Sequence, residues 1–350
     1  MKYRTMGNSG LMVSPLTLGT MTFGGGGFFA NVGVTQVDEA RELVAISRDA
    51  GVNLFDTADV YSWGESERIL GKALGASINE VLIATKVGMQ VGDDVNERGL
   101  SRRHIIRQCE QSLRNLGRDY IDLYQVHSWD GQTPLEETLG ALGHLVDQGK
   151  VRYVGCSNYS AWHMVKALGV ADREHLPPFV VTQNFYSPAF RDVEFELLPA
   201  AIDAGMGMLV WSPLAGGLTS GKYRRDRQPE SGRHLSEWDE PPIDDPERLW
   251  NTVDVLVEVG EEHNCSAAQV SLAWLMTRPG ITSVIVGARD RDQLADNLAA
   301  MELELTEAQI DRIERASRPK HIPYPMWHQR QTAAARLSEA DTVFPLESDD

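Results

Sequence analysis

The sequence predicts an α/β fold, a closed (β/α)₈ TIM barrel, from three observations: eight short apolar runs, helical stretches between them, and glycines that end those stretches. The runs are LTLGTMTF (16–23), VNLFDTA (52–58), VLIATKV (81–87), IDLYQVH (121–127), VRYVGCSN (151–158), VVTQNFY (180–186), GMLVWSP (207–213) and TSVIVGA (282–288). Most are continuously apolar rather than alternating, which is typical of parallel strands covered by helices.

Helical periodicity fills the stretches between these runs. The predicted helices span residues 37–51, 66–75, 102–117, 135–149 and 161–170, and Gly51, Gly75, Gly117 and Gly149 end four of them. Glycine is favoured there because it adopts the left-handed C-cap conformation most easily. An open doubly wound sheet is the alternative, but the count of eight βα units favours the barrel, for which about 250 residues suffice.

The remaining residues form additions to the barrel. Residues 1–15 are expected to form a hairpin that closes the barrel floor, with NSG as its turn. A polar insert follows the seventh strand (221–245), and a C-terminal extension from about Thr306 begins with a helix, TEAQIDRIERAS, and ends in an acidic tail, about 338–350, that we expect to be mobile. No shift in composition demands a second domain, so we predict one domain over 1–350.

Composition and charge exclude several classes of function. The chain has 350 residues, 42% of them hydrophobic, and a formal net charge of −17, which opposes binding to nucleic acid or anionic lipid. Cys109, Cys156 and Cys265 form no CxxC, so neither a disulfide framework nor a metal site is predicted. The start lacks a secretory signal, and no run reaches the roughly 18 apolar residues that span a bilayer. We therefore expect a cytoplasmic protein, and the sequence leaves open whether it forms a homo-oligomer.

Four chemically active side chains follow the ends of three consecutive predicted strands. Asp56 ends the second strand and Tyr61 follows it, Lys86 ends the third, and His127 ends the fourth. Each alone is equally compatible with a helix cap, a rim residue or a satisfied polar group. In a barrel, however, the carboxyl ends of the strands converge on one site. A lysine ammonium beside Tyr61 is expected to lower its pKa from about 10 and so make the phenol a usable proton donor.

The other strand ends indicate a hydride cofactor. A site that donates a proton but offers no nucleophile, metal cluster or phosphate loop needs a reaction partner, and a nicotinamide supplies one. Ser157, Asn158, Gln183 and Trp211, at successive strand ends, offer amide-complementary groups and an aromatic face. A Rossmann fold is excluded because the GGGG at 24–27 lacks the GxGxxG spacing and opens no helix.

Seven segments, in order, resemble the aldo-keto reductase superfamily, in particular its longer bacterial-type members, which are also similar to potassium-channel β-subunits. They are FDTADVYSWGESE, ATKVG, YQVHSWD, VGCSNYS, QNFYSP, WSPLAGGLTSGKY and VIVGARDRDQLADN, and the match runs from about Tyr3 to Arg330. The resemblance implies an NAD(P)H-dependent carbonyl reductase in which Tyr61 is the general acid, Asp56 and Lys86 tune it, and His127 orients the carbonyl of a small-molecule substrate.

The resemblance also implies cofactor contacts along the remaining strand ends. The implied contact residues are Thr20 and Met21 beneath the nicotinamide ribose; Ser157, Asn158 and Gln183 at the carboxamide; Trp211 stacked on the ring; Ser212, Leu214, Gly216, Leu218 and Lys222 over the pyrophosphate; and Gly287, Arg289, Gln293 and Asn297 at the adenosine end. Arg289 and the backbone N–H groups beside it favour a 2′-phosphate and hence NADP(H). Asp290 and Asp292 can neutralise that arginine, so NAD(H) stays open, as does a plain flexible loop at 212–222.

Three readings of function remain open. The first is a carbonyl reductase, the second a nicotinamide-binding regulatory subunit with weak catalysis, and the third a non-redox barrel such as a sugar-phosphate isomerase with Asp56 or His127 as base. Aromatic residues near the strand ends either line a substrate pocket or pack on the rim: Phe23, Phe28, Phe29, Trp63, Trp129 and Tyr186. From the C-terminal extension, Tyr324 or Trp327 is a candidate to fold over the mouth of the barrel. The run GGGGFF (24–29) is a candidate lid. The sequence assigns neither the substrate nor the direction of the reaction.

Overall fold

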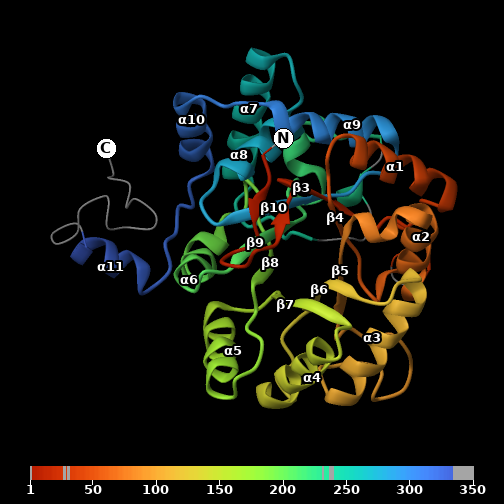
Figure 1. The fold of residues 1–350 in the computed structure, drawn as a ribbon. Helices are drawn as coiled ribbons and strands as arrows, with labels where there is room; N and C mark the ends of the chain where they lie inside the picture. Colours follow the sequence, from red (N-terminus) through yellow and green to blue (C-terminus); the bar gives the residue numbers. More distant parts are fainter. Residues whose placement is uncertain (1, 27–28, 30–31, 231, 236–239, 334–350) are drawn as a thin grey trace.

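The computed structural model describes residues 2–26, 29, 32–230, 232–235 and 240–333, and it contains a closed barrel of eight parallel strands (Figure 1). Around the barrel the order is β10, β3, β4, β5, β6, β7, β8 and β9. The strands are β3 Leu16–Gly19, β4 Leu54–Asp56, β5 Leu82–Val87, β6 Ile121–Val126, β7 Val151–Ser157, β8 Val181–Phe185, β9 Gly207–Trp211 and β10 Ile281–Val286. Each coincides with one of the predicted runs, so the predicted (β/α)₈ barrel is confirmed.

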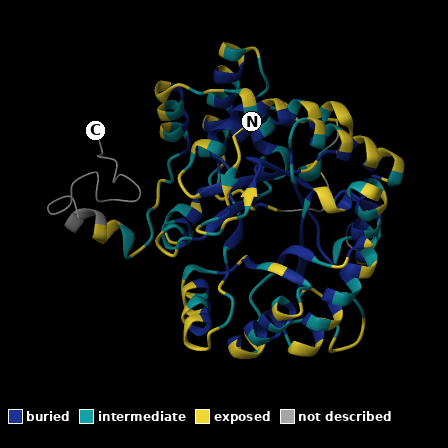
Figure 2. Cartoon of the chain, in the orientation of Figure 1, coloured by how far each residue is buried: buried dark blue, intermediate teal, exposed yellow. Residues whose placement is uncertain are grey.

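Helices surround the barrel and turn their exposed residues outward (Figure 2). They are α1 Val37–Asp49, α2 Glu65–Leu74, α3 Arg102–Leu116, α4 Leu135–Asp147, α5 Ala161–Arg173, α6 Leu197–Asp203, α7 Pro246–His263, α8 Ala267–Thr277, α9 Arg291–Ala299 and α10 Glu307–Ser317. A further helix, α11 Met326–Ala333, follows them in the chain. The five helices predicted between strands are confirmed. Helix α3 illustrates their ends: the Ser101 side chain accepts from the His104 N–H at the start, and Gly117, with φ 68°, ends it.

The additions to the barrel lie largely where the sequence places them. Strands β1 (Arg4–Thr5) and β2 (Met12–Val13) pair antiparallel, and Met6 and Val13 pack in one cluster with inward-facing strand residues such as Leu123. The hairpin thus closes the barrel floor. Helix α10 confirms the predicted C-terminal helix, whereas α11 lies apart from the barrel in Figure 1. The acidic tail at 338–350 lies outside the described residues.

The barrel interior changes from apolar to polar along the strands, and this change positions the site. Near the hairpin, the buried inward side chains are Leu54, Ala84, Leu123, Val181, Leu209 and Ile285. Two residues further along four of these strands the inward side chains are Asp56, Lys86, Gln125 and Gln183, each at most 2% exposed. Successive residues of a strand point to opposite faces, so a step of two keeps the same face. The carboxyl half of the barrel is therefore a buried polar layer.

No helix in the described ranges is both long and apolar enough to cross a lipid bilayer.

Candidate active site

Lys86 is the centre of the polar layer. Its Nζ donates to Asp56 Oδ1 at 2.5 Å and to the Thr57 carbonyl at 2.9 Å, and it lies 3.5 Å from Tyr61 Oη. The side chains of Lys86 and Asp56 are 1% and 4% exposed. The strands β4 and β5 are adjacent, and the loop after β4 folds back over Lys86, so the three predicted residues Asp56, Tyr61 and Lys86 do converge.

The charges around Lys86 keep it protonated. Burial by itself would lower the pKa of Lys86, but the Asp56 carboxylate and then the Tyr61 phenol raise it, and the net shift is upward. An ammonium held in this way is a fixed positive charge beside the phenol. The pair is neutral overall, which makes its burial tolerable.

The expected fall in the pKa of Tyr61 is wrong for this structure. Burial raises the pKa of Tyr61 above its usual value of 10.0; Lys86 opposes this rise, while Asp56 and Asp59 add to it. The effect of the lysine on the phenol is outweighed by burial together with the two carboxylates, and a pattern of strand ends reveals neither. Tyr61 is therefore fully protonated near neutral pH, which is the state that a proton donor requires.

A strained turn fixes Tyr61 in the loop after β4. The Asp59 N–H donates to the Lys86 carbonyl at 3.2 Å, and the short helix η2 (Tyr61–Gly64) follows. Ser62 and Trp63 have φ of 50° and 58°, a conformation that costs non-glycine residues about 1–3 kcal/mol each. The Ser62 hydroxyl accepts from the Gly25 N–H at 3.0 Å. Such contacts hold the turn against its strain.

His127 completes the predicted group of four. Its ring centroid lies 5.8 Å from that of Tyr61, and its backbone N–H donates to the Val87 carbonyl at 2.8 Å. Burial, and then Lys86, lower the pKa of His127 to about 3. The imidazole is therefore neutral at physiological pH, and its Nδ1 has no hydrogen-bond partner among the described residues. A neutral imidazole beside the phenol can donate one hydrogen bond to a substrate oxygen.

Gln125 belongs to this group and was not predicted. It is fully buried, two residues before His127 on β6, and lies between Asp56 and Gln183. Gln183 Nε2 donates to Asp56 Oδ2 at 2.9 Å, so the second oxygen of Asp56 is occupied as well. Applying the two-residue alternation of strands to the YQVH segment could have placed Gln125 on the same inner face as His127.

The predicted nicotinamide residues form one connected group. Ser157 Oγ donates to the Gln183 carbonyl at 2.8 Å, and Asn158, with φ of 55°, donates its side-chain N–H to the His127 carbonyl at 3.1 Å. Trp211 Nε1 in turn donates to Asn158 Oδ1 at 3.0 Å. The structure thus brings Ser157, Asn158, Gln183 and Trp211 together beside His127, with the indole N–H edge of Trp211 at the Asn158 amide.

Thr20 and Met21 lie at the end of β3, as predicted. The Thr20 hydroxyl contacts the Asp56 carbonyl at 3.1 Å and the Ser66 hydroxyl at 2.8 Å, so its side chain is engaged with the loop that carries Tyr61. Met21 is half-buried.

The predicted pyrophosphate loop is the short helix η5 (Ala215–Ser220) and its flanks. Ser212, Ala215, Gly216 and Gly217 all have positive φ, and the Gly216 N–H donates to Ser212 Oγ at 3.2 Å. Leu214 and Gly216 are half-buried and Lys222 is exposed, whereas Leu218 is buried in a cluster with Tyr223, Leu249 and Val253. The loop therefore offers backbone groups, a hydroxyl and one ammonium to a ligand.

Arg233 is a residue of the insert that the sequence reasoning missed. It begins the short helix η6 (Arg233–Leu235), which packs on the pyrophosphate loop through the His234 to Ala215 hydrogen bond. Burial, and then the like charge of Arg289, lower the pKa of Arg233. Two guanidinium groups held near each other are typical of a phosphate site. In the sequence, the one signal for Arg233 was that it lies among the charged residues of the polar insert at 221–245.

At the predicted adenosine end, Gly287 and Arg289 are exposed and precede α9. The Arg289 N–H donates to Gln293 Oε1 at 2.9 Å, and Asp290 caps the helix by accepting from the Gln293 N–H. Asp290 is thus engaged by the helix, and no ion pair to Arg289 occurs among the described residues. Asn297, by contrast, is 2% exposed and lies in the interior.

The aromatic residues near the strand ends divide by burial. Phe29 packs on the Tyr61 ring, with centroids 5.3 Å apart, and Trp63 is 49% exposed. Phe23 and Tyr186 are buried core residues, and Trp129 stacks on His163. Tyr324 and Trp327 are exposed near α11, while Phe28 and part of the GGGGFF run lie outside the described residues.

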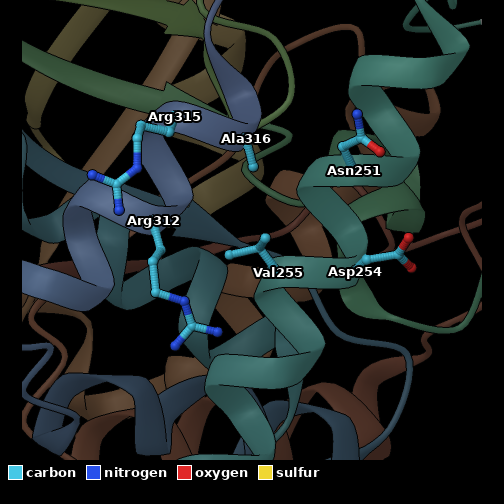
Figure 3. Close-up of a pocket in the computed structure, with 6 residues that line it drawn as sticks. All are labelled: Asn251, Asp254, Val255, Arg312, Arg315 and Ala316. Carbon is cyan, nitrogen blue, oxygen red and sulfur yellow. The ribbon is translucent and has the colours of Figure 1, made fainter. Parts of the chain in front are cut away.

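A shallow, open hollow of about 470 Å³ lies elsewhere, between α7 and α10 (Figure 3). Its lining residues are Asn251, Asp254, Val255, Arg312, Arg315 and Ala316, and none of them belongs to the polar layer. Within the described chain, no group of three or more His, Cys, Asp or Glu side chains is arranged to hold a metal ion.

Comparison with known proteins agrees with this geometry. The model of the Aldo/keto reductase family matches residues 15–318. Similar proteins include a probable voltage-gated potassium channel subunit beta of Arabidopsis thaliana (36% identical, covering 91% of this chain and 98% of the relative) and one of Oryza sativa subsp. japonica (37%, with the same coverage). The uncharacterized oxidoreductase YrpG of Bacillus subtilis (strain 168) is 38% identical over 87% of this chain and 92% of its own length. The chain therefore belongs to the aldo/keto reductase family.

Proposed function

We propose that the protein reduces aldehydes, ketones or sugar carbonyls to alcohols with NADPH, and that Tyr61 is the general acid. The observation that carries this proposal is the contact set of Lys86, whose ammonium lies 3.5 Å from the Tyr61 hydroxyl while Asp56 holds it from the other side. A protonated phenol beside a fixed cation is suited to donate a proton to an oxygen that becomes negative.

Each residue of the group has a distinct part in this reaction. The neutral His127 and the Tyr61 hydroxyl hold the substrate oxygen by hydrogen bonds. As negative charge develops on that oxygen, Tyr61 transfers its proton, and Lys86 stabilises the phenolate that remains. Asp56 keeps Lys86 charged and in place, and Gln125 and Gln183 keep Asp56 from turning away. The Tyr61 proton is restored from solvent after the product leaves.

The residues at the other strand ends fit a nicotinamide cofactor. Asn158, Gln183 and Trp211 place two amides and a half-buried indole beside His127, and a bound carboxamide would exchange some of their present hydrogen bonds for its own. The backbone of η5 offers a loop with positive φ at Gly216 and Gly217. Arg233 and Arg289 are the cations for phosphate groups, and Arg289 is the basis for our preference for NADP(H) over NAD(H). When bound, the reduced nicotinamide supplies the hydride.

Turnover tests the proposal directly. The purified protein is mixed with NADPH or NADH and a panel of aldehydes, ketones and sugars, with 4-nitrobenzaldehyde as a broad first substrate, and the loss of the nicotinamide absorbance is followed. Carbonyl-dependent loss that is faster with NADPH supports the proposal. No turnover across the panel contradicts it.

A second candidate is a nicotinamide-binding regulatory subunit with weak catalysis, because two of the similar proteins are named as probable potassium channel β-subunits. The intact group around Lys86 favours the enzyme. Stoichiometric capture of a partner protein, together with negligible turnover, would favour the subunit. A non-redox barrel, in contrast, predicts that NADPH does not quench the fluorescence of Trp211.

We further propose that residues 1–350 act as one cytoplasmic domain whose partner is a small-molecule carbonyl compound rather than nucleic acid or membrane. The net charge of −17 supports the second part of this statement. Whether copies of the chain associate is measured by analytical ultracentrifugation.

A further inference from the structure

Asp59 is a buried carboxyl beside the proposed site that the mechanism does not use. It lies three residues after Asp56 and two before Tyr61, and it is 4% exposed. Neither of its oxygens has a side-chain hydrogen-bond partner, and the nearest donor is the backbone N–H of the adjacent Val60; Asp59 is the one acidic residue in the described part of the chain whose buried oxygens are in this state. Buried polar groups are nearly always paired, so this exception requires an explanation.

The neighbouring carboxyls are fully engaged. Asp56 accepts from Lys86 and Gln183, and Glu67 accepts from Thr85 at 2.7 Å and from Asn115 at 2.9 Å. Among the described residues, Lys86 is the cation that lowers the pKa of Asp59, and its ammonium already faces Asp56, the Thr57 carbonyl and Tyr61. An ionised Asp59 would therefore be a buried charge without a counter-charge of its own, and a group in that position keeps its proton instead.

The charged and titratable groups that face Asp59 shift its pKa in opposite directions. Burial, and then Glu67 of α2, raise the pKa of Asp59 well above its usual value, while the nearby Val60 amide and Lys86 of β5 lower it. Tyr61 of η2 and Tyr124 of β6 face it too, and a charge on Asp59 raises the pKa of both phenols. The Asp59 backbone N–H donates to the Lys86 carbonyl at 3.2 Å, which fixes the main chain at Asp59 against β5.

We propose that Asp59 is a proton-linked positioning residue. When it is protonated, the Lys86 ammonium stays bound to Asp56 and beside the Tyr61 hydroxyl. When it is ionised, Asp59 competes with both groups for that ammonium. This inference rests on the proposed function, because it concerns the efficiency of the same proton transfer. Ionisation places a second negative charge near one ammonium and makes Tyr61 a weaker acid. Activity therefore falls as the pH rises through the titration of Asp59.

The test is the pH profile of kcat for the wild type and for Asp59→Asn, which imitates the protonated acid. At acidic pH the two proteins have similar kcat. One pH unit above the midpoint of the alkaline fall, Asp59→Asn is expected to exceed the wild type about tenfold, since about nine-tenths of a simple acid is ionised there. Asp59→Glu, which can still ionise, is expected to restore an alkaline fall.

A matched control is Asp122→Asn, which removes another buried carboxyl, one that is paired with Arg118 outside the proposed site. This variant is expected to keep the wild-type alkaline fall. If Asp59→Asn also keeps it with an unchanged midpoint, the inference is overturned. A uniform loss of kcat at every pH would indicate a merely structural role and overturns it too.

Infrared spectroscopy provides a readout that needs no turnover. The difference spectrum of wild type minus Asp59→Asn at neutral pH is expected to show the carbonyl stretch of a protonated carboxylic acid, which disappears on raising the pH. If only carboxylate bands appear, the inference is wrong whatever the kinetics show. If the wild type reduces no carbonyl compound, the proposed function fails, while this spectrum still decides whether Asp59 holds a proton.

Discussion

Replacing Lys86 by methionine perturbs stability and chemistry together, and the structure indicates the size of both effects. The Lys86 and Asp56 side chains are 1% and 4% exposed, so water cannot solvate the carboxylate left behind. Breaking a buried ion pair from one side costs about 3–5 kcal/mol of the free energy of unfolding. Gln183 and Gln125 still donate to Asp56 in the variant, which places the expected loss near the lower value, about 3 kcal/mol.

A double variant separates the charge from the packing. Asp56→Asn combined with Lys86→Met removes both charges, and we expect it to be about 2 kcal/mol more stable than Lys86→Met alone. Urea denaturation followed by tryptophan fluorescence measures both values. A loss below about 1 kcal/mol in the single variant, or a double variant less stable than the single one, would refute the reasoning about the buried pair.

Lys86→Met also tests the chemistry, because the phenolate left by proton transfer loses its counter-charge. We expect kcat to fall by about 10²- to 10⁴-fold, the range typical of assisted proton transfer. The dissociation constant for NADPH, measured by fluorescence quenching, should change little. Full activity in a folded Lys86→Met protein would show that the ammonium does not assist Tyr61.

Other predictions follow from the same geometry. Burial holds the pKa of His127 near 3 in the folded protein, below its usual value of 6.5. The unfolded chain therefore binds the extra proton, and the stability of the wild type falls as the pH drops from about 6.5 towards 3; the unfolding free energy of His127→Gln should lack this dependence on pH. Arg289→Gln should weaken NADPH binding about tenfold or more and leave NADH binding almost unchanged, and equal weakening of both would remove the 2′-phosphate assignment. Arg233→Gln should weaken both cofactors, and an unchanged affinity for each would exclude contact with their phosphate groups. Gln125→Leu leaves Asp56 with one donor fewer and should lower kcat more than it raises KM; an unchanged kcat would mean that Gln125 does not help to hold Asp56.

The fold was predictable because each strand has a recognisable local sequence pattern. A parallel strand is buried on both faces, so its run is continuously apolar, and a glycine marks the end of several helices. Helices α7 and α8 were not singled out in the sequence. In α8, residues 267–275 are buried except for Gln269, so this helix lacks the polar face that helical periodicity detects.

The site was predictable as a set of positions but not as a set of interactions. Strand ends meet in a barrel, so Asp56, Lys86 and His127 could be grouped from the order of the runs alone. The direction of the pKa shift of Tyr61 could not be predicted, because it depends on burial and on how many carboxylates lie nearby. Asp59 escaped notice for the same reason, since a carboxyl without a partner looks in the sequence like any other.

Contacts between segments that are distant in the chain were the hardest features to predict from the sequence. The proximity of Arg233 to Arg289 depends on how the insert folds back over η5, and no local pattern specifies that path. Thr20 illustrates the opposite case: its position at the end of β3 was right, but its hydroxyl is engaged with Asp56 and Ser66. Sequence position thus identifies a residue at a strand end, whereas packing determines which partners its side chain contacts.

Single-turnover kinetics of Tyr61→Phe tests the central claim most directly. The variant keeps the ring that packs between Phe29 and His127 and loses only the hydroxyl beside Lys86. We predict that it binds NADPH with nearly wild-type affinity, as judged by fluorescence quenching, and transfers hydride to 4-nitrobenzaldehyde at least about 10²-fold more slowly. A variant that binds NADPH and reduces the aldehyde at the wild-type rate would contradict the assignment of Tyr61 as the general acid.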